Sequence, residues 1–173
     1  MKILIAYGSL GKFFHLKEFS EALQKLDVQT MLVKDSDYST GFPSKKPKEW
    51  IGTNKKFKNL ISEFKPDAVF IDRQSHFGID TIKFKIPLFI LLRGHYWSEI
   101  EWAKKTLYKG PLMRTVIWFR NNIAEKCFRN ATAVLPICKY LEDVVKEHHP
   151  DQSTLPFLEG IDAEHWYNVE GMN

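Results

Sequence analysis

Short apolar runs alternate with longer amphipathic stretches along this chain. The first run, 2–7, has the length of a strand and is rich in β-branched and aromatic residues. It ends at Gly8-Ser9-Leu10-Gly11, and apolar residues then recur at helical spacing as far as Leu26. This order predicts a buried strand, a glycine turn and an amphipathic helix. Because the run is apolar on both faces, we expect a central parallel strand that is covered by helices on each side.

The same alternation continues along most of the chain. It predicts further strands at 28–33, 68–71, 86–92, 131–135 and 154–158, and helices from about 49 to 64, through 79–82, after residue 95, from 111 to about 129, and over 139–147. Alternating strands and helices favour a parallel sheet with right-handed crossovers. We therefore expect an α/β fold, a Rossmann-like parallel sheet with helices on both faces, in a single domain.

Composition and length limit the class of protein that the chain can be, but they do not indicate a function. The 173 residues suffice for one domain with a proper core, and the net charge of +4 is mild. Cys127 and Cys138 lack metal-ligand spacing and a secretory context, so reduced thiols and a cytoplasmic location are the expectation. The chain opens on a core strand and contains no apolar run of about 20 residues, which leaves a soluble or a peripheral membrane protein.

Polar residues follow three of the predicted strands at the point where each strand ends. The clusters are Gly8 to Gly11, Asp72 to His76, and Arg93 to His95. Each cluster taken alone is ordinary solvated loop chemistry. In an open parallel sheet, however, the carboxyl ends of the strands share one edge, and ligands bind there. We expect one crevice lined by all three clusters, with His15 nearby. No metal site is expected, because no two histidines have i, i+4 spacing.

Cations and tryptophans gather in two further stretches. In the helix from residue 111 to about 129, one face is predicted to pack in the core, through Leu112, Val116, Ile123, Ala124 and Cys127. The opposite face carries Arg114, Lys126 and Arg129 around Trp118, and a second patch places Trp50 beside Lys55 and Lys56. Such patches suit the surface of an anionic membrane. A solvated face with one incidental aromatic residue is an equal alternative, and nucleic acid is not expected, since no motif accompanies the charge.

Two smaller expectations concern single residues. Arg120 falls on the apolar side of its helix, so it is predicted to reach the crevice or to pair with a buried acid. His148 and His149 lie beside Pro150 after a surface helix and are predicted to be solvated.

The order of these segments resembles the N-terminal domain of the GT-B glycosyltransferases, specifically the retaining family 4 group. The matching pieces are the turn Gly8-Ser9-Leu10-Gly11 and the helix ending Glu21-Ala22-Leu23, the strand Lys65-Pro66-Asp67-Ala68-Val69-Phe70, the stretch from Ile86-Pro87-Leu88 to Gly94-His95, the stretch from Ala124 to Val134 with Cys138-Lys139-Tyr140-Leu141, and a hinge-like segment from Leu158 to Trp166. The chain departs from the family in four ways: its two glycines are not adjacent, Cys138 stands where Ser is common, Glu159 stands where Asn is common, and the sequence stops at Asn173, where the family continues into a second Rossmann domain.

The resemblance implies that two domains share the reaction, one binding the acceptor and the other the donor. Residues 1–158 would form an acceptor-binding domain, and 159–173 a hinge toward a C-terminal donor-binding domain, supplied in cis or in trans. His95 would lie near the donor sugar as the catalytic residue. Gly8, Ser9 and Gly11 would approach the donor diphosphate. The remaining crevice residues, His15, Asp72, Arg73, His76 and Arg93, would bind substrate. A nucleotide-sugar would be the co-substrate, with no separate cofactor and no metal.

Several functions remain open at this point. The leading hypothesis is half of a glycosyltransferase that moves a sugar to a glycan or lipid-linked acceptor, as a peripheral protein at the cytosolic membrane face. Without the second domain we expect no transfer. The alternatives are a non-catalytic sugar- or nucleotide-binding module and the acceptor subunit of a two-chain enzyme. A flavodoxin- or receiver-like domain is less favoured, because the first strand does not end in an acidic pair.

Overall fold

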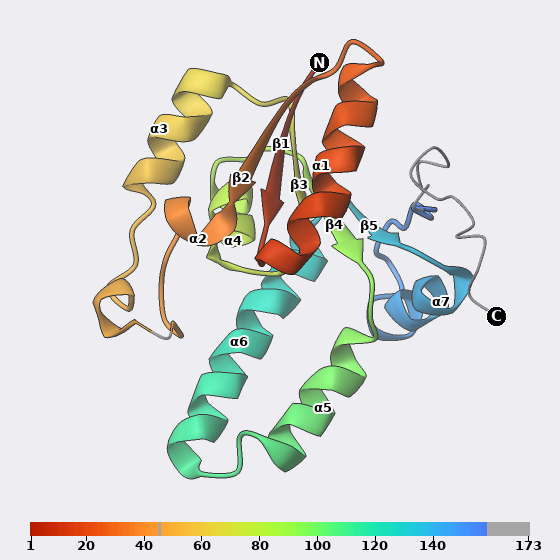
Figure 1. Cartoon of the computed structure of the whole chain (residues 1–173). Helices are drawn as coiled ribbons and strands as arrows, with labels where there is room; N and C mark the ends of the chain where they lie inside the picture. Colours follow the sequence, from red (N-terminus) through yellow and green to blue (C-terminus); the bar gives the residue numbers. More distant parts are fainter. Residues whose placement is uncertain (45, 159–173) are drawn as a thin grey trace, which may run out of the picture.

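The computed structural model describes residues 1–44 and 46–158, and its centre is a five-stranded parallel sheet in the order β2-β1-β3-β4-β5 (Figure 1). The strands are β1 (Lys2–Tyr7), β2 (Gln29–Lys34), β3 (Ala68–Ile71), β4 (Leu88–Leu92) and β5 (Ala133–Pro136). In register, Ile5 of β1 lies between Leu32 and Phe70 on its two neighbours. The predicted single-domain, Rossmann-like α/β fold is confirmed.

Helices connect the strands in the alternation that the sequence predicts. They are α1 (Leu10–Gln24), α2 (Asp35–Tyr38), α3 (Lys55–Phe64), α4 (His76–Lys83), α5 (Tyr96–Thr106), α6 (Pro111–Asn130) and α7 (Lys139–His148), with a 3-10 turn at Pro47–Glu49. Pro111 opens α6, where its fixed φ and missing N–H cost nothing. Lys65, the residue that follows the last turn of α3, takes the left-handed conformation and ends the helix.

Two apolar clusters cover the two faces of the sheet. Successive residues of a strand point to opposite faces, so Leu4 joins one cluster and Ile5 the other. The larger cluster packs under Phe57 of α3, Phe77 of α4 and Phe128 of α6, all fully buried. The smaller cluster lies under α1 and also takes in Phe157, Phe70, Leu91 and Leu135. Both faces are therefore covered, and the carboxyl edge is where polar side chains can gather.

The strand order reverses between β1 and β3. From β1 the chain steps outward to β2, and it then returns to the other side of β1 to lay down β3, β4 and β5. The connections that follow β1 and β3 consequently diverge to opposite faces of the sheet at the carboxyl ends of these two strands. This position, which we call the switch point, is where ligands bind in open sheets of this kind.

α5 and α6 form a helical hairpin that extends from the carboxyl edge of the sheet (Figure 1). The last turns of α6 pack in the domain, where Cys127 lies against Gly78 of α4. The first turns of α6 lie outside the domain beside α5. Arg120 Nη1 donates a hydrogen bond to the Tyr108 hydroxyl at 2.7 Å, which braces the two arms of the hairpin.

Several local predictions are corrected. α3 begins at Lys55, not near residue 49, because the preceding segment forms a loop closed by a bridge between Thr40 and Thr53. The predicted sixth strand at 154–158 is reduced to one bridge, between Thr154 and Val134. Leu112 is 73% exposed, so the prediction that it packs in the core was wrong. Arg120 is exposed and contacts Tyr108 rather than a buried acid.

Candidate functional site

The glycine turn and Asp72 meet at the switch point. The Gly8 backbone N–H donates to Asp72 Oδ1 at 2.8 Å, which ties the end of β1 to the end of β3. A Cβ at Gly8 would lie 2.7 Å from Arg73 Nε, so glycine is needed there for close packing. A Cβ at Gly11, in the first turn of α1, would meet no atom within 4 Å. The described fold therefore gives no steric reason for glycine at position 11.

Asp72 is a buried carboxylate with spare hydrogen-bonding capacity. The residue is only 6% exposed, and its Oδ2 accepts no hydrogen bond from any described residue. The nearest cation is Lys12, whose Nζ lies 3.9 Å from Oδ2. Burial raises the pKa of Asp72 above its usual value, and the Lys12 charge and the Gly8 N–H oppose that rise. Buried polar atoms are normally satisfied, so this oxygen is placed to accept a hydrogen bond from a ligand or from water.

An ion pair joins the ends of β2 and β3 across β1. Arg73 contacts the Asp35 carboxylate through Nη2 at 2.7 and 2.8 Å and through Nε at 3.1 Å. Asp35 is buried, whereas the Arg73 side chain remains 45% exposed. Two-pronged pairs of this kind hold both partners in a defined geometry. The Arg73 side chain is thus held by Asp35 on one side and remains accessible to solvent or to a ligand on the other.

His76 holds a loop rather than projecting into free space. Its Nε2 lies 2.9 Å from the Phe42 carbonyl oxygen, in the loop that leads to α3. Gly41 packs against the imidazole so closely that a Cβ there would lie 2.5 Å from Cε1. The sequence predicts a substrate contact for His76. That prediction remains untested, and the observed role of the ring is to fix the loop beside the switch point.

His95 follows β4 and caps α5. Its Nδ1 accepts a hydrogen bond from the Ser98 backbone N–H at 3.2 Å. A neutral imidazole whose Nδ1 accepts carries its proton on Nε2, so His95 presents an N–H donor. Tyr140 and His148 lie beside the ring, with centroids 6.0 and 6.4 Å away.

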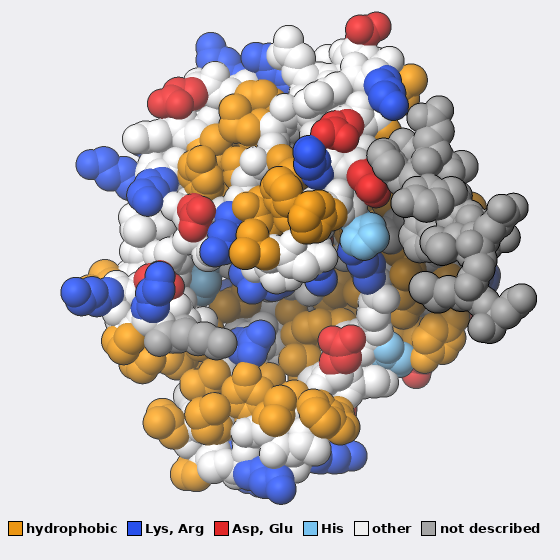
Figure 2. All heavy atoms as spheres, viewed as in Figure 1, with side chains coloured by type: hydrophobic (Ala, Val, Ile, Leu, Met, Phe, Trp, Pro, Cys, Tyr) orange, Lys and Arg blue, Asp and Glu red, His pale blue; other side chains and the backbone are white. Residues whose placement is uncertain are grey.

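The structure brings the three predicted clusters to one edge of the sheet, because β1, β3 and β4 are parallel neighbours. Arg93 and Gly94 lie directly beyond β4 on that edge. Ser9 precedes α1 as its N-cap residue without a side-chain capping bond, and His15 is exposed further along the helix. We call the set Gly8, Ser9, Gly11, Asp72, Arg73, His76, Arg93 and His95 the carboxyl rim. Figure 2 shows this side of the molecule hollowed between the domain and the hairpin.

Sequence reasoning missed two charged members of this site, Lys12 and Asp35. Asp35 follows β2 directly, as Asp72 follows β3, so the strand-end rule that found Asp72 could also have found Asp35. Lys12 carries no such signal. Its role depends on the first turn of α1 lying over the end of β3, which is a tertiary contact.

The prediction that His149 is solvated was wrong. His149 Nε2 lies 3.1 Å from Glu125 Oε2, and its side chain is only 10% exposed. The neighbouring indole of Trp97 stacks between Phe128 and His148, and its Nε1 donates to Glu125 at 3.1 Å. Burial lowers the pKa of His149, and Glu125 acts against that shift. This cluster joins α5, α6 and α7 behind the rim.

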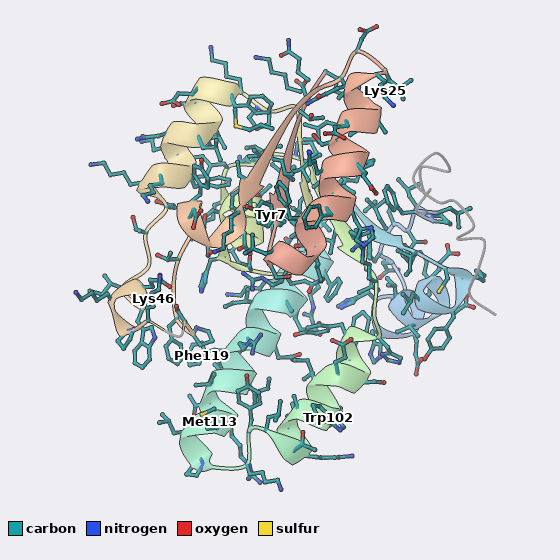
Figure 3. The ribbon with its side chains drawn as sticks, in the orientation of Figure 1. Tyr7, Lys25, Lys46, Trp102, Met113 and Phe119 are labelled. Atoms are coloured by element: carbon teal, nitrogen blue, oxygen red, sulfur yellow. The ribbon has the colours of Figure 1, made fainter. Side chains whose placement is uncertain are left out.

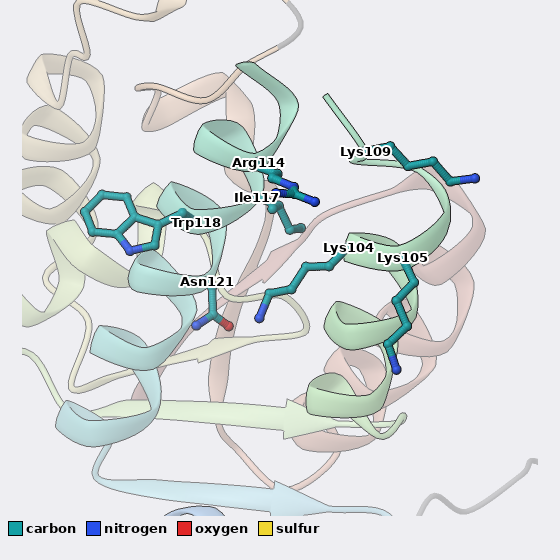
Figure 4. A pocket seen from close by; sticks show the side chains of 7 residues that line it. All are labelled: Lys104, Lys105, Lys109, Arg114, Ile117, Trp118 and Asn121. Atoms are coloured by element: carbon teal, nitrogen blue, oxygen red, sulfur yellow. The ribbon is translucent and has the colours of Figure 1, made fainter. Parts of the chain in front are cut away.

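The predicted membrane-contact residues are all exposed, on three separate elements. Trp118 and Arg114 line a cavity of about 630 Å³ between the arms of the hairpin, together with Lys104, Lys105, Lys109, Ile117 and Asn121 (Figure 4). Lys126 and Arg129 lie at the other end of α6, Trp50 follows the 3-10 turn, and Lys55 and Lys56 open α3.

No group of three or more His, Cys, Asp or Glu side chains in residues 1–44 and 46–158 is placed to hold a metal ion. In the same residues, no helix combines the length and the apolarity that crossing a bilayer requires.

Comparison with known proteins adds no family. No protein-family model matches the chain, and no match to it is found among curated proteins. The function must therefore be argued from the site itself.

Proposed function

We propose that this chain is the acceptor-binding half of a glycosyltransferase of the GT-B type, which moves a sugar from a nucleotide-sugar to an acceptor hydroxyl. The observation that carries the proposal is Asp72, a buried carboxylate with an unsatisfied oxygen at the switch point of a Rossmann-like sheet. The resemblance of the strand-end motifs to retaining family 4 enzymes supports the reaction class. The hinge-like segment that belongs to this resemblance lies, apart from Leu158, within 159–173, outside the described residues.

In the proposed complex, three parts of the carboxyl rim contact the substrates. His95 donates from Nε2 to a hydroxyl of the donor sugar. The backbone N–H groups at Gly8 to Gly11 lie at the start of α1 and approach the donor phosphates, where a helix N-terminus favours negative charge. Asp72 Oδ2 accepts a hydrogen bond from the acceptor, within reach of Lys12.

The transfer itself breaks the bond between the anomeric carbon and the diphosphate oxygen. The acceptor oxygen then bonds to the anomeric carbon on the same face, and the acceptor proton leaves with the diphosphate. The negative charge that develops on the diphosphate needs preorganised cations. In this proposal a second lobe supplies most of them, so the 173-residue chain binds substrate without turning it over.

Gly11 supports a ligand at the turn. Its missing side chain leaves open space that no described residue fills. Beside it, Leu10 and Phe14 expose large apolar side chains on the first turns of α1. A second lobe that closed over the carboxyl rim would cover both of them.

The test is nuclear magnetic resonance titration of the ¹⁵N-labelled chain with UDP-glucose, GDP-mannose and their free nucleotides. We expect shifts at Gly8, Gly11 and His95 for at least one nucleotide-sugar. Gly11→Ala should weaken that binding at least about tenfold, because its methyl group enters the space left for the phosphates, while the free energy of unfolding stays within about 0.5 kcal/mol of the unmodified value. Gly110→Ala is the matched control, since its Cβ also meets no atom within 4 Å.

The outcomes separate the candidate functions. Shifts confined to residues far from the carboxyl rim, or equal binding by both glycine variants, would contradict the proposal. Where the rim binds, the gene sequence that follows residue 173 distinguishes the enzyme from the alternatives. A second Rossmann domain with a Glu-x7-Glu segment supports the enzyme. A stop codon at that point supports a binding module or a two-chain enzyme.

A further inference from the structure

The far end of the α5–α6 hairpin is apolar and exposed. Six large apolar side chains on this one hairpin are solvent-exposed: Trp102, Leu107, Leu112, Met113, Trp118 and Phe119. Figure 2 shows hydrophobic side chains gathered at the end of the molecule beyond the domain, with Lys and Arg side chains beside them, and Figure 3 places Trp102 and Met113 on this part of the hairpin. An apolar patch of this kind on a small protein marks an interaction surface rather than a free one.

The cavity between the two arms gives this surface its charge. Its lining includes four cations, Lys104, Lys105, Lys109 and Arg114, and contains no carboxylate (Figure 4). Lys104 is paired with Glu101 at 2.6 Å. For Lys105, Lys109 and Arg114, no carboxylate in the described part of the chain lies within 4.0 Å. Three cations are thus left to bind an external anion at the base of the apolar tip.

The cavity keeps its shape through contacts on both sides. Arg120 holds Tyr108, and the Tyr96 hydroxyl donates to Asn121 Oδ1 at 3.3 Å across the two helices. Trp118 packs edge-on against Phe119, with ring centroids 4.8 Å apart, and Phe119 packs in turn against Phe42 of the neighbouring loop. The cationic cavity and its aromatic rim are therefore preformed.

We propose that this hairpin docks the protein on the surface of an anionic phospholipid bilayer. Lipid phosphates enter the cavity, the indoles of Trp102 and Trp118 lie at headgroup depth, and Leu107 and Leu112 reach the start of the acyl chains. A bilayer offers anions and apolar chains side by side, which matches the pattern on the hairpin. Nucleic acid is a poorer match, because it binds to stacked aromatic residues and cations and leaves exposed aliphatic side chains uncovered.

The inference goes beyond the proposed function and does not depend on it. The residues that carry it lie on the hairpin, and none of them belongs to the carboxyl rim. Loss of vesicle binding would leave nucleotide-sugar binding intact, and the reverse also holds.

The first test is co-sedimentation with phosphatidylcholine vesicles that contain about 30 mol% phosphatidylglycerol. We expect binding that weakens when NaCl is raised from about 0.1 to about 0.5 M. The double substitution Lys105→Glu/Lys109→Glu should weaken binding about thirtyfold or more, because each cation near an anionic surface contributes roughly a fivefold factor. Lys17→Glu/Lys25→Glu, with one position on α1 and the other directly after it, makes the same change in net charge and should retain binding within about threefold.

A second pair of variants tests the apolar contact. Leu112 and Leu26 are both 73% exposed, and Leu26 lies in the turn after α1. Leu112→Ser should lower vesicle binding severalfold, whereas Leu26→Ser should not, and both proteins should stay folded because neither side chain is buried.

Four results would overturn the proposal: no binding by the unmodified chain, equal binding to vesicles of phosphatidylcholine alone, equal losses in the hairpin and control variants, or a dimer in sedimentation velocity that Leu112→Ser dissociates. The last result would mean that a second copy of the chain covers the hairpin.

Discussion

The negative charge of Asp72 contributes little to the stability of the fold. One backbone N–H and one ammonium group at 3.9 Å face a carboxylate that is almost wholly buried. Burying a charge with incomplete pairing costs free energy. Groups of this kind are retained at functional sites, where stability is given up for a ligand contact. The pKa of Asp72 is raised, mainly by burial, which is the signature of that cost.

Asp72→Asn is therefore expected to stabilise the protein at pH 7. Asparagine keeps an acceptor for the Gly8 N–H and removes the buried charge, so the free energy of unfolding should rise by roughly 1 kcal/mol. A raised pKa in the folded state means that the native protein binds the proton more tightly, so the carboxylate lowers stability as the pH rises through that pKa. The gain should consequently vanish in acid, below the usual aspartate value. Urea unfolding at a series of pH values measures it, and a loss of stability at pH 7 would contradict it.

At the scale of elements, a single aromatic stack joins three helices. Trp97 of α5 lies between Phe128 of α6 and His148 of α7, with ring centroids 5.0 and 4.2 Å away. Glu125 receives the indole N–H and also faces His149. Because the hairpin leaves the domain near this stack, the stack helps to hold the base of the hairpin, together with the packing of α6 on α4.

This junction should make stability depend on pH. Burial lowers the pKa of His149, and Arg129 and His148 add to the shift while Glu125 opposes it. A histidine whose pKa is lowered by folding takes up its proton first in the unfolded state. Stability is therefore complete above about pH 7 and falls as the pH drops from about 6.5 through the lowered value. His149→Phe keeps an aromatic ring in place and should flatten this dependence.

Urea midpoints between pH 5 and pH 8 provide the measurement for His149→Phe. His15→Phe is the matched control, because His15 is exposed on α1, away from the junction. Identical pH profiles for the unmodified protein and His149→Phe would show that the ring does not titrate in this range.

The sequence predicts the strands well because each buried strand is a continuous apolar run with a polar end. The same rule places Asp72 and His95 on one edge once the sheet is parallel. Helical periodicity predicts burial wrongly where the surroundings of a helix change along its length. Leu112 shares a helical face with Cys127, but the first turns of α6 project beyond the domain, so Leu112 is exposed and Cys127 is buried. The prediction that His149 is solvated was wrong for the opposite reason, because residues of α5 and α6 that are distant in the sequence bury it.

At the scale of the whole molecule, the two proposed surfaces lie on one side. The strands run toward the hairpin, so the carboxyl rim and the hairpin share the same end of the domain. Figure 3 shows Trp102 and Met113 at that end, Lys25 at the opposite end, and Tyr7, the last residue of β1, between them. A protein docked through the hairpin would hold its rim close to the bilayer, where a lipid-linked acceptor would be presented.

The orientation can be measured from a natural label site. Cys138 is exposed at the start of α7, two residues beyond the carboxyl end of β5 and on the rim side, whereas Cys127 is buried and its pKa is raised to about 12 by that burial. A maleimide dye should therefore react with Cys138 alone in the folded protein. For comparison, Lys25→Cys in a Cys138→Ser background places the dye at the far end of α1. A helix of 15 residues separates the two ends by about 20 Å.

With an acceptor dye in the headgroup region of anionic vesicles, energy transfer should be stronger from Cys138 than from Lys25→Cys. The difference should disappear in about 0.5 M NaCl, as docking is screened. Both labelled proteins must first show equal vesicle binding, since a dye that blocks docking would also lower transfer. Equal transfer from the two sites in bound protein would mean that the domain lies on its side. Stronger transfer from Lys25→Cys would mean that the rim faces away from the membrane, and a lipid-linked acceptor would then have no route to Asp72.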